Sequence, residues 1–209
     1  MRDPADATER LHRRVRRIVA VIIVYHIVEA CVAIGAGAAA SSTALVGFGL
    51  DSSIEAASAL ALAWQFTRRD PKRWERPTLR VIGTAFFAMA AYITADALSS
   101  LVRAAPVDRS PVGIAVTVAS LIAMPVMAWF QSRAGRALGS RSVAAEAQQL
   151  MLSGYLSAAV LVGLLLNWAF AWSWSDSVAA LVVAVLAVRE GIVAWRGARP
   201  DPLADGQPT

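Results

Sequence analysis

The stretch GFGLDSSIEAASALALAWQF, residues 47–66, has the length of a membrane-spanning helix and yet contains two carboxylates. A helix crosses the hydrocarbon core of a bilayer with about 20 mostly apolar residues. Asp51 and Glu55 are spaced i, i+4 and therefore share one face of that helix. A charged side chain at mid-bilayer costs about 2.5–3.5 kcal/mol. The pair therefore predicts that these carboxylates have a neutralising partner, a water-filled cavity or a function.

The rest of the chain has the composition of a membrane protein. Of its 209 residues, 57% are hydrophobic and 17% are charged, and the charged residues cluster between long apolar stretches. The stretches long enough to span a bilayer are residues 18–38, 44–66, 79–102, 112–131, 147–170 and 177–196. We therefore expect an all-α membrane protein with six transmembrane helices. Residues 1–17 form a basic N-terminal segment, residues 18–197 the six-helix domain and residues 198–209 a disordered tail.

The positions of the basic residues predict the orientation of the helices. Of the 20 Lys and Arg, all but Arg103 and Arg109 belong to the N-terminal segment, to the loops 67–80 and 132–146, or to the C-terminal end. Because cytoplasmic loops are rich in these residues, both termini are predicted to be cytoplasmic. The Arg- and Ala-rich composition is typical of a GC-rich bacterial genome, so we expect a multi-pass protein of a bacterial cytoplasmic membrane. The arginines are dispersed without a nucleic-acid-reading motif, so we expect contact with membrane lipid and not with nucleic acid.

Ionisable residues recur inside the first three predicted spans, and no lysine or arginine lies deep in any span to neutralise them. They are His26, Glu29, Asp51, Glu55 and Asp96. The missing positive charge is then expected from a metal cation or a proton. Two ionised carboxylates one turn apart repel each other, and a divalent cation would remove that repulsion and release protons as it enters. The alternative is that these acids are protonated and hydrogen-bonded between helices.

The other three residues of this group have less specific signals. His26 and Glu29 are spaced i, i+3, so they either form a pair that fixes helix packing or support an ion path. Asp96 is either a solvated carboxylate near a helix end or a proton-relay group. Asp176 precedes the last span and is typical of a helix cap.

The fifth span carries neutral oxygen donors at helical spacing. Gln149, Ser153 and Ser157 follow one another at i, i+4 and i+8 and therefore share a face. If this face meets Asp51 and Glu55, an oxygen-rich site results, which suits magnesium or manganese better than a thiolate site would. Zinc more often takes His or Cys. Alternatively, these polar residues only hydrogen-bond neighbouring helices.

Three stretches of the sequence together resemble one known family. SSTALVGFGLDSSIEAASAL, residues 41–60, resembles the second transmembrane helix of the cation diffusion facilitators. GSRSVAAEAQQLMLSGYLS, residues 139–157, resembles the approach to their fifth helix, and SDSVAALVVAVLAVREGIVAWR, residues 175–196, resembles their sixth.

The resemblance implies a metal site built from the second and fifth helices, here from Asp51, Glu55, Gln149 and Ser153. It also implies homodimers and proton-coupled export of zinc, manganese, iron or related divalent ions. The chain departs from the family at the fifth helix, where His or Asp and then Asp are usual. It also has only about a dozen residues after the last helix, which resembles a short, divergent branch without the family's cytoplasmic metal-sensing domain.

The sequence thus predicts a secondary transporter that exports divalent cations, by proton antiport, through a site between the second and fifth helices. His26, Glu29 and Asp96 are candidates for proton relay or for a supporting shell. The metal ion is substrate, and no prosthetic group is expected. The spans contain no nucleophile with a paired base, so an enzyme is not expected. The alternative is a non-transporting membrane protein that binds a metal or a partner subunit.

Overall fold

The computed structural model describes residues 4–65, 71–138 and 141–197, and for some residues at helix ends it describes the backbone alone. These residues form six α-helices and short turns between them, without a strand. The helices are α1 (Pro4–Ala40), α2 (Thr43–Gln65), α3 (Pro71–Arg103), α4 (Pro111–Leu138), α5 (Arg141–Phe170) and α6 (Trp174–Gly197).

All six helices contain a stretch that is long and apolar enough to cross a membrane. These stretches are Ala20–Ala40, Thr43–Ala61, Arg76–Arg103, Pro111–Arg133, Gln149–Phe170 and Trp174–Gly197. The predicted all-α fold with six membrane helices is confirmed. The tail predicted over residues 198–209 lies outside the described residues.

The helices extend beyond the apolar stretches, and two of the expected loops are wrong for that reason. Much of the basic stretch 67–80 is the first part of α3, and most of 132–146 belongs to α4 and α5. Arginine and alanine are good helix formers, so the basic segments continue the helices into the region beyond the apolar core. α3 also begins with a proline, Pro71, whose missing N–H is tolerated in a first helical turn.

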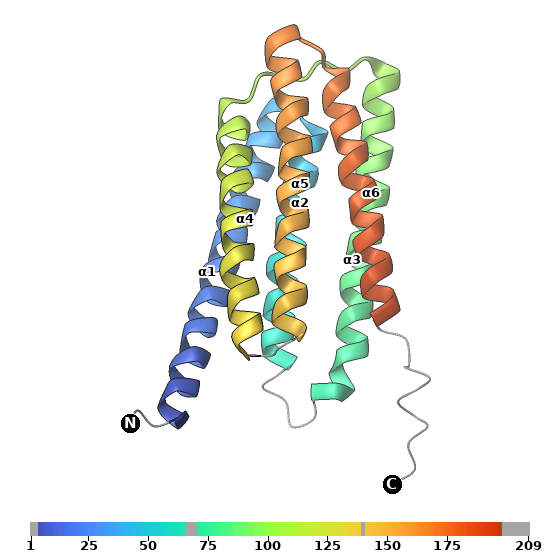
Figure 1. Ribbon diagram of the computed structural model, residues 1–209. Helices are drawn as coiled ribbons and strands as arrows, with labels where there is room; N and C mark the ends of the chain where they lie inside the picture. Colours follow the sequence, from blue (N-terminus) through green and yellow to red (C-terminus); the bar gives the residue numbers. More distant parts are fainter. Residues whose placement is uncertain (1–3, 66–70, 139–140, 198–209) are drawn as a thin grey trace.

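The helix α2 is the centre of the bundle, because it packs against α1, α3, α5 and α6. In Figure 1, α1 and α4 lie on one side, α3 and α6 on the other, and α5 passes in front of α2. The chain runs up and down, so the start of α1 and the end of α6 lie at the same end of the bundle. This agrees with an even number of spans, and the assignment of that end to the cytoplasm stays a prediction from the arginine pattern.

The turn between α1 and α2 is short because the residue after α1 has a left-handed backbone conformation. Ser41 has a φ of 55°, and the Ser42 N–H donates to the Gly37 carbonyl at 2.9 Å. This bonding pattern closes a helix C-terminus and reverses the chain within two residues. It places Ser42 and Thr43 at the N-terminus of α2, where they meet α3 and α6.

Glycines in the first two spans predict close helix packing, and the structure separates those that pack from one that does not. A Cβ added at Gly49 of α2 would stand 2.9 Å from the Ile34 nitrogen and 3.1 Å from the Ala30 oxygen of α1. A Cβ added at Gly37 would stand 2.7 Å from the Val46 nitrogen. A Cβ at Gly35, by contrast, would meet nothing within 4 Å. Gly49 and Gly37 therefore set the approach of α1 to α2.

We predict that Gly49→Ala lowers the apparent melting temperature of the purified protein, measured by circular dichroism in detergent. The added methyl group would press on α1 backbone atoms that cannot move independently, and so α1 and α2 would separate. Gly35→Ala is the matched control and should leave the melting temperature unchanged or raise it, since alanine favours a helix over glycine by about 1 kcal/mol. Equal effects of the two substitutions would contradict this packing.

Candidate cation site at the junction of α1, α2 and α5

The Glu55 carboxylate of α2 receives hydrogen bonds from α5. The Ser153 hydroxyl donates to Glu55 Oε1 at 2.5 Å, and the Gln149 amide donates to the same oxygen at 3.4 Å. Gln149 and Ser153 are one turn apart, so both project from one face of α5. The polar faces of α2 and α5 therefore meet, as the site prediction requires.

The other carboxylate oxygen of Glu55 faces α1. His26 Nδ1 lies 3.3 Å from Glu55 Oε2 and 3.5 Å from Glu29 Oε2. Glu29 also accepts a hydrogen bond from Ser52 of α2 at 2.6 Å and another from the Ser120 hydroxyl of α4. A network of hydroxyl, imidazole and carboxylate groups thus joins α1, α2, α4 and α5 around Glu55.

Asp51 lies one helical turn from Glu55 and is 5% exposed. The carboxylates of Glu55, Glu190 and Glu29 all act on it electrostatically. Glu190 belongs to α6, where Arg189 pairs with it at 3.1 Å. Within the described residues Asp51 has no hydrogen-bond donor, whereas Glu29 and Glu55 each accept hydrogen bonds from two side chains.

The group carries an excess of acidic side chains. Throughout the part of the chain that the structure describes, no lysine or arginine pairs with Glu29, Asp51 or Glu55. Repulsion between buried carboxylates is relieved by protons or by a cation, and such sites mark ion pathways in membrane proteins. No three His, Cys, Asp or Glu side chains among the described residues already converge on one point as metal ligands. Cation binding would therefore require some of these side chains to turn.

Comparison with known proteins identifies the family. A family model described as the cation efflux transmembrane domain matches residues 19–194. The chain belongs to the cation efflux family. The resemblance to cation diffusion facilitators, first indicated by Asp51 and Glu55 in the second span, is thereby confirmed.

A relative of this cation efflux protein is found in a cyanobacterium. An uncharacterised transporter of Synechocystis sp. (strain ATCC 27184 / PCC 6803 / Kazusa) is 29% identical to it over 160 residues, which are 72% of this chain. The same match covers 52% of the relative, so the chain spans about half of that protein's length. The family match to a transmembrane domain and the six apolar helices together indicate an integral multi-pass membrane protein.

Asp96 lies apart from the other predicted site residues of this cation efflux protein. Its carboxylate accepts a hydrogen bond from the Thr43 hydroxyl at 2.5 Å. Thr43 is twelve residues before Glu55 in α2, which corresponds to about 18 Å along the helix. A relay role for Asp96 stays a prediction, and any such relay would have to act at the other end of α2.

Asp176 has a different structural role from the predicted one. It stands in the first turn of α6, yet it accepts hydrogen bonds from the Ser42 hydroxyl at 2.5 Å and from the Ala44 N–H at 3.2 Å. It therefore caps α2, the helix that carries the acidic pair, and not only its own helix. A carboxylate at a helix N-terminus satisfies free N–H groups and complements the helix dipole.

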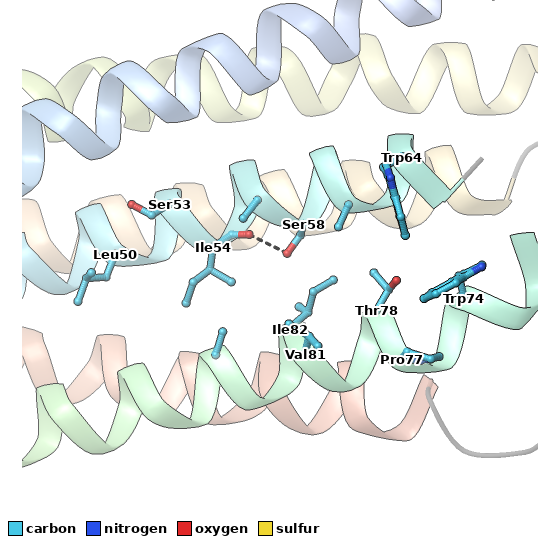
Figure 2. A pocket seen from close by; sticks show the side chains of 13 residues that line it. Leu50, Ser53, Ile54, Ser58, Trp64, Trp74, Pro77, Thr78, Val81 and Ile82 are labelled. Atoms are coloured by element: carbon cyan, nitrogen blue, oxygen red, sulfur yellow. Dashed lines mark hydrogen bonds between the residues drawn. The ribbon is translucent and has the colours of Figure 1, made fainter. Parts of the chain in front are cut away.

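A second feature of α2 is an apolar groove on its other face, which opens toward α3 (Figure 2). The groove has a volume of about 520 Å³, and none of its described lining residues is charged. Trp64 and Trp74 stand at one end of it with ring centroids 5.4 Å apart. The Ser58 hydroxyl donates to the Ile54 carbonyl of its own helix at 2.7 Å, so it leaves the groove apolar. This groove is separate from the acidic site, and its described lining contains no charged ligand for a cation.

Sequence reasoning missed three partners of the acidic residues. The hydroxyls of Ser52 and Ser120 bind Glu29, and Glu190 acts on Asp51. Ser52 follows Asp51 directly, and a buried hydroxyl in an apolar span is a signal for an interhelical hydrogen bond. Ser120 has the same signal in α4. Its partner on α1 could be found only once the helices were placed.

We predict that Ser153→Ala lowers the apparent melting temperature, because a buried carboxylate that loses a donor is destabilised by about 1–3 kcal/mol. Ser157→Ala is the matched control. Ser157 is also buried and lies one turn further along α5, but its hydroxyl donates only to the Ser153 carbonyl of its own helix. Thermal unfolding of both variants in detergent should show a loss for Ser153→Ala alone. A similar loss for both would mean that the bond to Glu55 contributes nothing.

Proposed function

We propose that this protein exports divalent metal cations from the cytoplasm by exchange for protons, through a site between α2 and α5. The observation that carries the proposal is the position of Glu55. It is buried in the bundle, it is held by Gln149 and Ser153 of α5, and Asp51 precedes it by one turn on the same face. An acidic α2 face closed by oxygen donors of α5 is suited to a divalent cation.

In this proposal Asp51 and Glu55 supply the negative charge, and Gln149 and Ser153 supply neutral oxygens. Without a cation, Glu55 accepts hydrogen bonds from α5. With a cation, the Ser153 hydroxyl and the Gln149 amide would turn their oxygens toward the ion. Protons held by the carboxylates would leave as the cation enters, so that little net charge is added to the membrane interior. This exchange would couple the cation to the proton gradient.

The surroundings of the site agree with a relay function for two α1 residues. His26 and Glu29 lie beside Glu55, so they are the nearest groups that could pass a proton to or from it. Alternating access would come from tilting of α2 and α5 relative to the rest of the bundle around the site. We further propose a homodimer in a bacterial cytoplasmic membrane, on the strength of the family and the cyanobacterial relative.

A second candidate is a membrane protein that binds a cation without moving it. One observation favours it: among its described side chains, α5 presents an amide and a hydroxyl to Glu55 and no carboxylate. A site with fewer carboxylates attracts a cation less strongly and holds fewer protons to exchange for it, so cation entry is coupled less tightly to proton release. The experiment below distinguishes the two candidates.

The test is a flux measurement in proteoliposomes that contain a metal-sensitive dye and an acidic lumen. We expect the full chain to accumulate zinc or manganese in the lumen and to stop when the pH gradient is collapsed. Glu55→Gln and Asp51→Asn should each lower the initial rate by at least about tenfold, as expected when a ligand of the ion is lost. Flux that persists without a pH gradient would contradict antiport.

The matched control is Asp108→Asn. Asp108 is an exposed acid in the turn between α3 and α4, and this change should leave the rate unchanged. A wild-type protein that binds the cation in solution but moves none would favour the second candidate. Unchanged flux in both site variants would show that the cation crosses the protein elsewhere.

A further inference from the structure

The α1 helix brings an imidazole to the proposed cation site. His26 is 2% exposed, and its Nδ1 atom lies 3.3 Å from Glu55 Oε2. The two residues are 29 positions apart in the sequence and come from different helices. The same two helices pack closely at Gly49.

The distance between these two atoms matches that of two ligands bound to one ion. Zinc binds nitrogen and oxygen at about 2.0–2.1 Å in tetrahedral geometry, which puts neighbouring ligand atoms about 3.3–3.4 Å apart. A cation could therefore bridge His26 Nδ1 and Glu55 Oε2 with little displacement of either side chain.

The hydrogen bonds to Glu55 leave the required oxygen available. Both α5 donors, Ser153 and Gln149, bind Oε1, whereas Oε2 is buried and accepts no hydrogen bond among the described residues. A buried carboxylate oxygen without a donor loses about 1–3 kcal/mol relative to one that has a donor. A cation at this position would remove that loss.

Glu29 keeps the imidazole in place and has little freedom to follow an ion itself. Its two carboxylate oxygens accept hydrogen bonds from Ser52 and Ser120, so it is fixed between α2 and α4. It lies 3.5 Å from His26 Nδ1. Glu29 therefore acts as a positioning residue for His26.

We propose that His26 of α1 is a ligand of the transported cation together with Glu55, so that the site is built from α1 as well as from α2 and α5. This inference rests on the proposed function, since it assumes that Glu55 binds the cation. It also narrows the substrate class. Imidazole suits zinc and similar transition-metal ions, whereas magnesium and calcium take oxygen ligands. The preferred substrate is then a zinc-like ion.

The test is X-ray absorption at the zinc edge, on the purified full chain in detergent with one equivalent of zinc. We expect the scattering pattern of an imidazole ligand in the wild-type spectrum and its loss in His26→Gln. The affinity for zinc should fall by about tenfold or more in this variant, while the affinity for manganese changes less. A wild-type spectrum without an imidazole ligand would overturn the inference even if the variant fails to fold.

The matched control is His12→Gln. The chain contains two histidines, so any imidazole signal must come from His26 or His12, and His12→Gln should keep the signal. A shell of oxygen ligands alone in the wild type, or a signal that depends on His12, would overturn the inference while leaving cation transport by Glu55 intact. A wild-type chain that binds no divalent cation would contradict both the inference and the proposed function.

Discussion

The structure depends on one constraint: the Glu55 carboxylate is placed inside the helical bundle, and no described lysine or arginine pairs with it. Its two oxygens face different helices, one toward Ser153 and Gln149 of α5 and the other toward His26 of α1. A buried carboxylate in lipid is tolerated only with such partners. The polar face of α2 thereby determines which faces α1 and α5 must present to it.

The two ends of α2 are organised differently, and this difference bears on function. At its N-terminus, Asp176 of α6 caps the helix through Ser42 and Ala44, so both oxygens of this carboxylate accept hydrogen bonds. One turn before Glu55, Asp51 is buried without a donor among the described residues and lies near other acids. The capped N-terminus can hold α2 in place, and the Asp51 carboxylate in its middle is available to bind an ion. A transporter needs both, because an ion must be held and then released while the helices stay packed.

Much of this arrangement was predictable from sequence, and the remainder required the tertiary structure. Span length and the i, i+4 spacing of Asp51 and Glu55 depend on local geometry, so six helices and an acidic face followed directly. The spacing of Gln149 and Ser153 likewise gave the polar face of α5. The contact of His26 with Glu55 depends on how α1 crosses α2, which no local pattern records. Asp176 was predicted as a cap, but the helix that it caps is set by the fold.

The central claim is that a cation binds inside the bundle at Glu55. The most direct measurement is an experimental structure of the zinc-loaded protein in which anomalous scattering locates the ion. We expect an ion within coordination distance of the Glu55 carboxylate, inside the bundle where α1, α2 and α5 meet. An ion found only on surface residues, with Glu55 still bonded to Ser153 and Gln149, would contradict it.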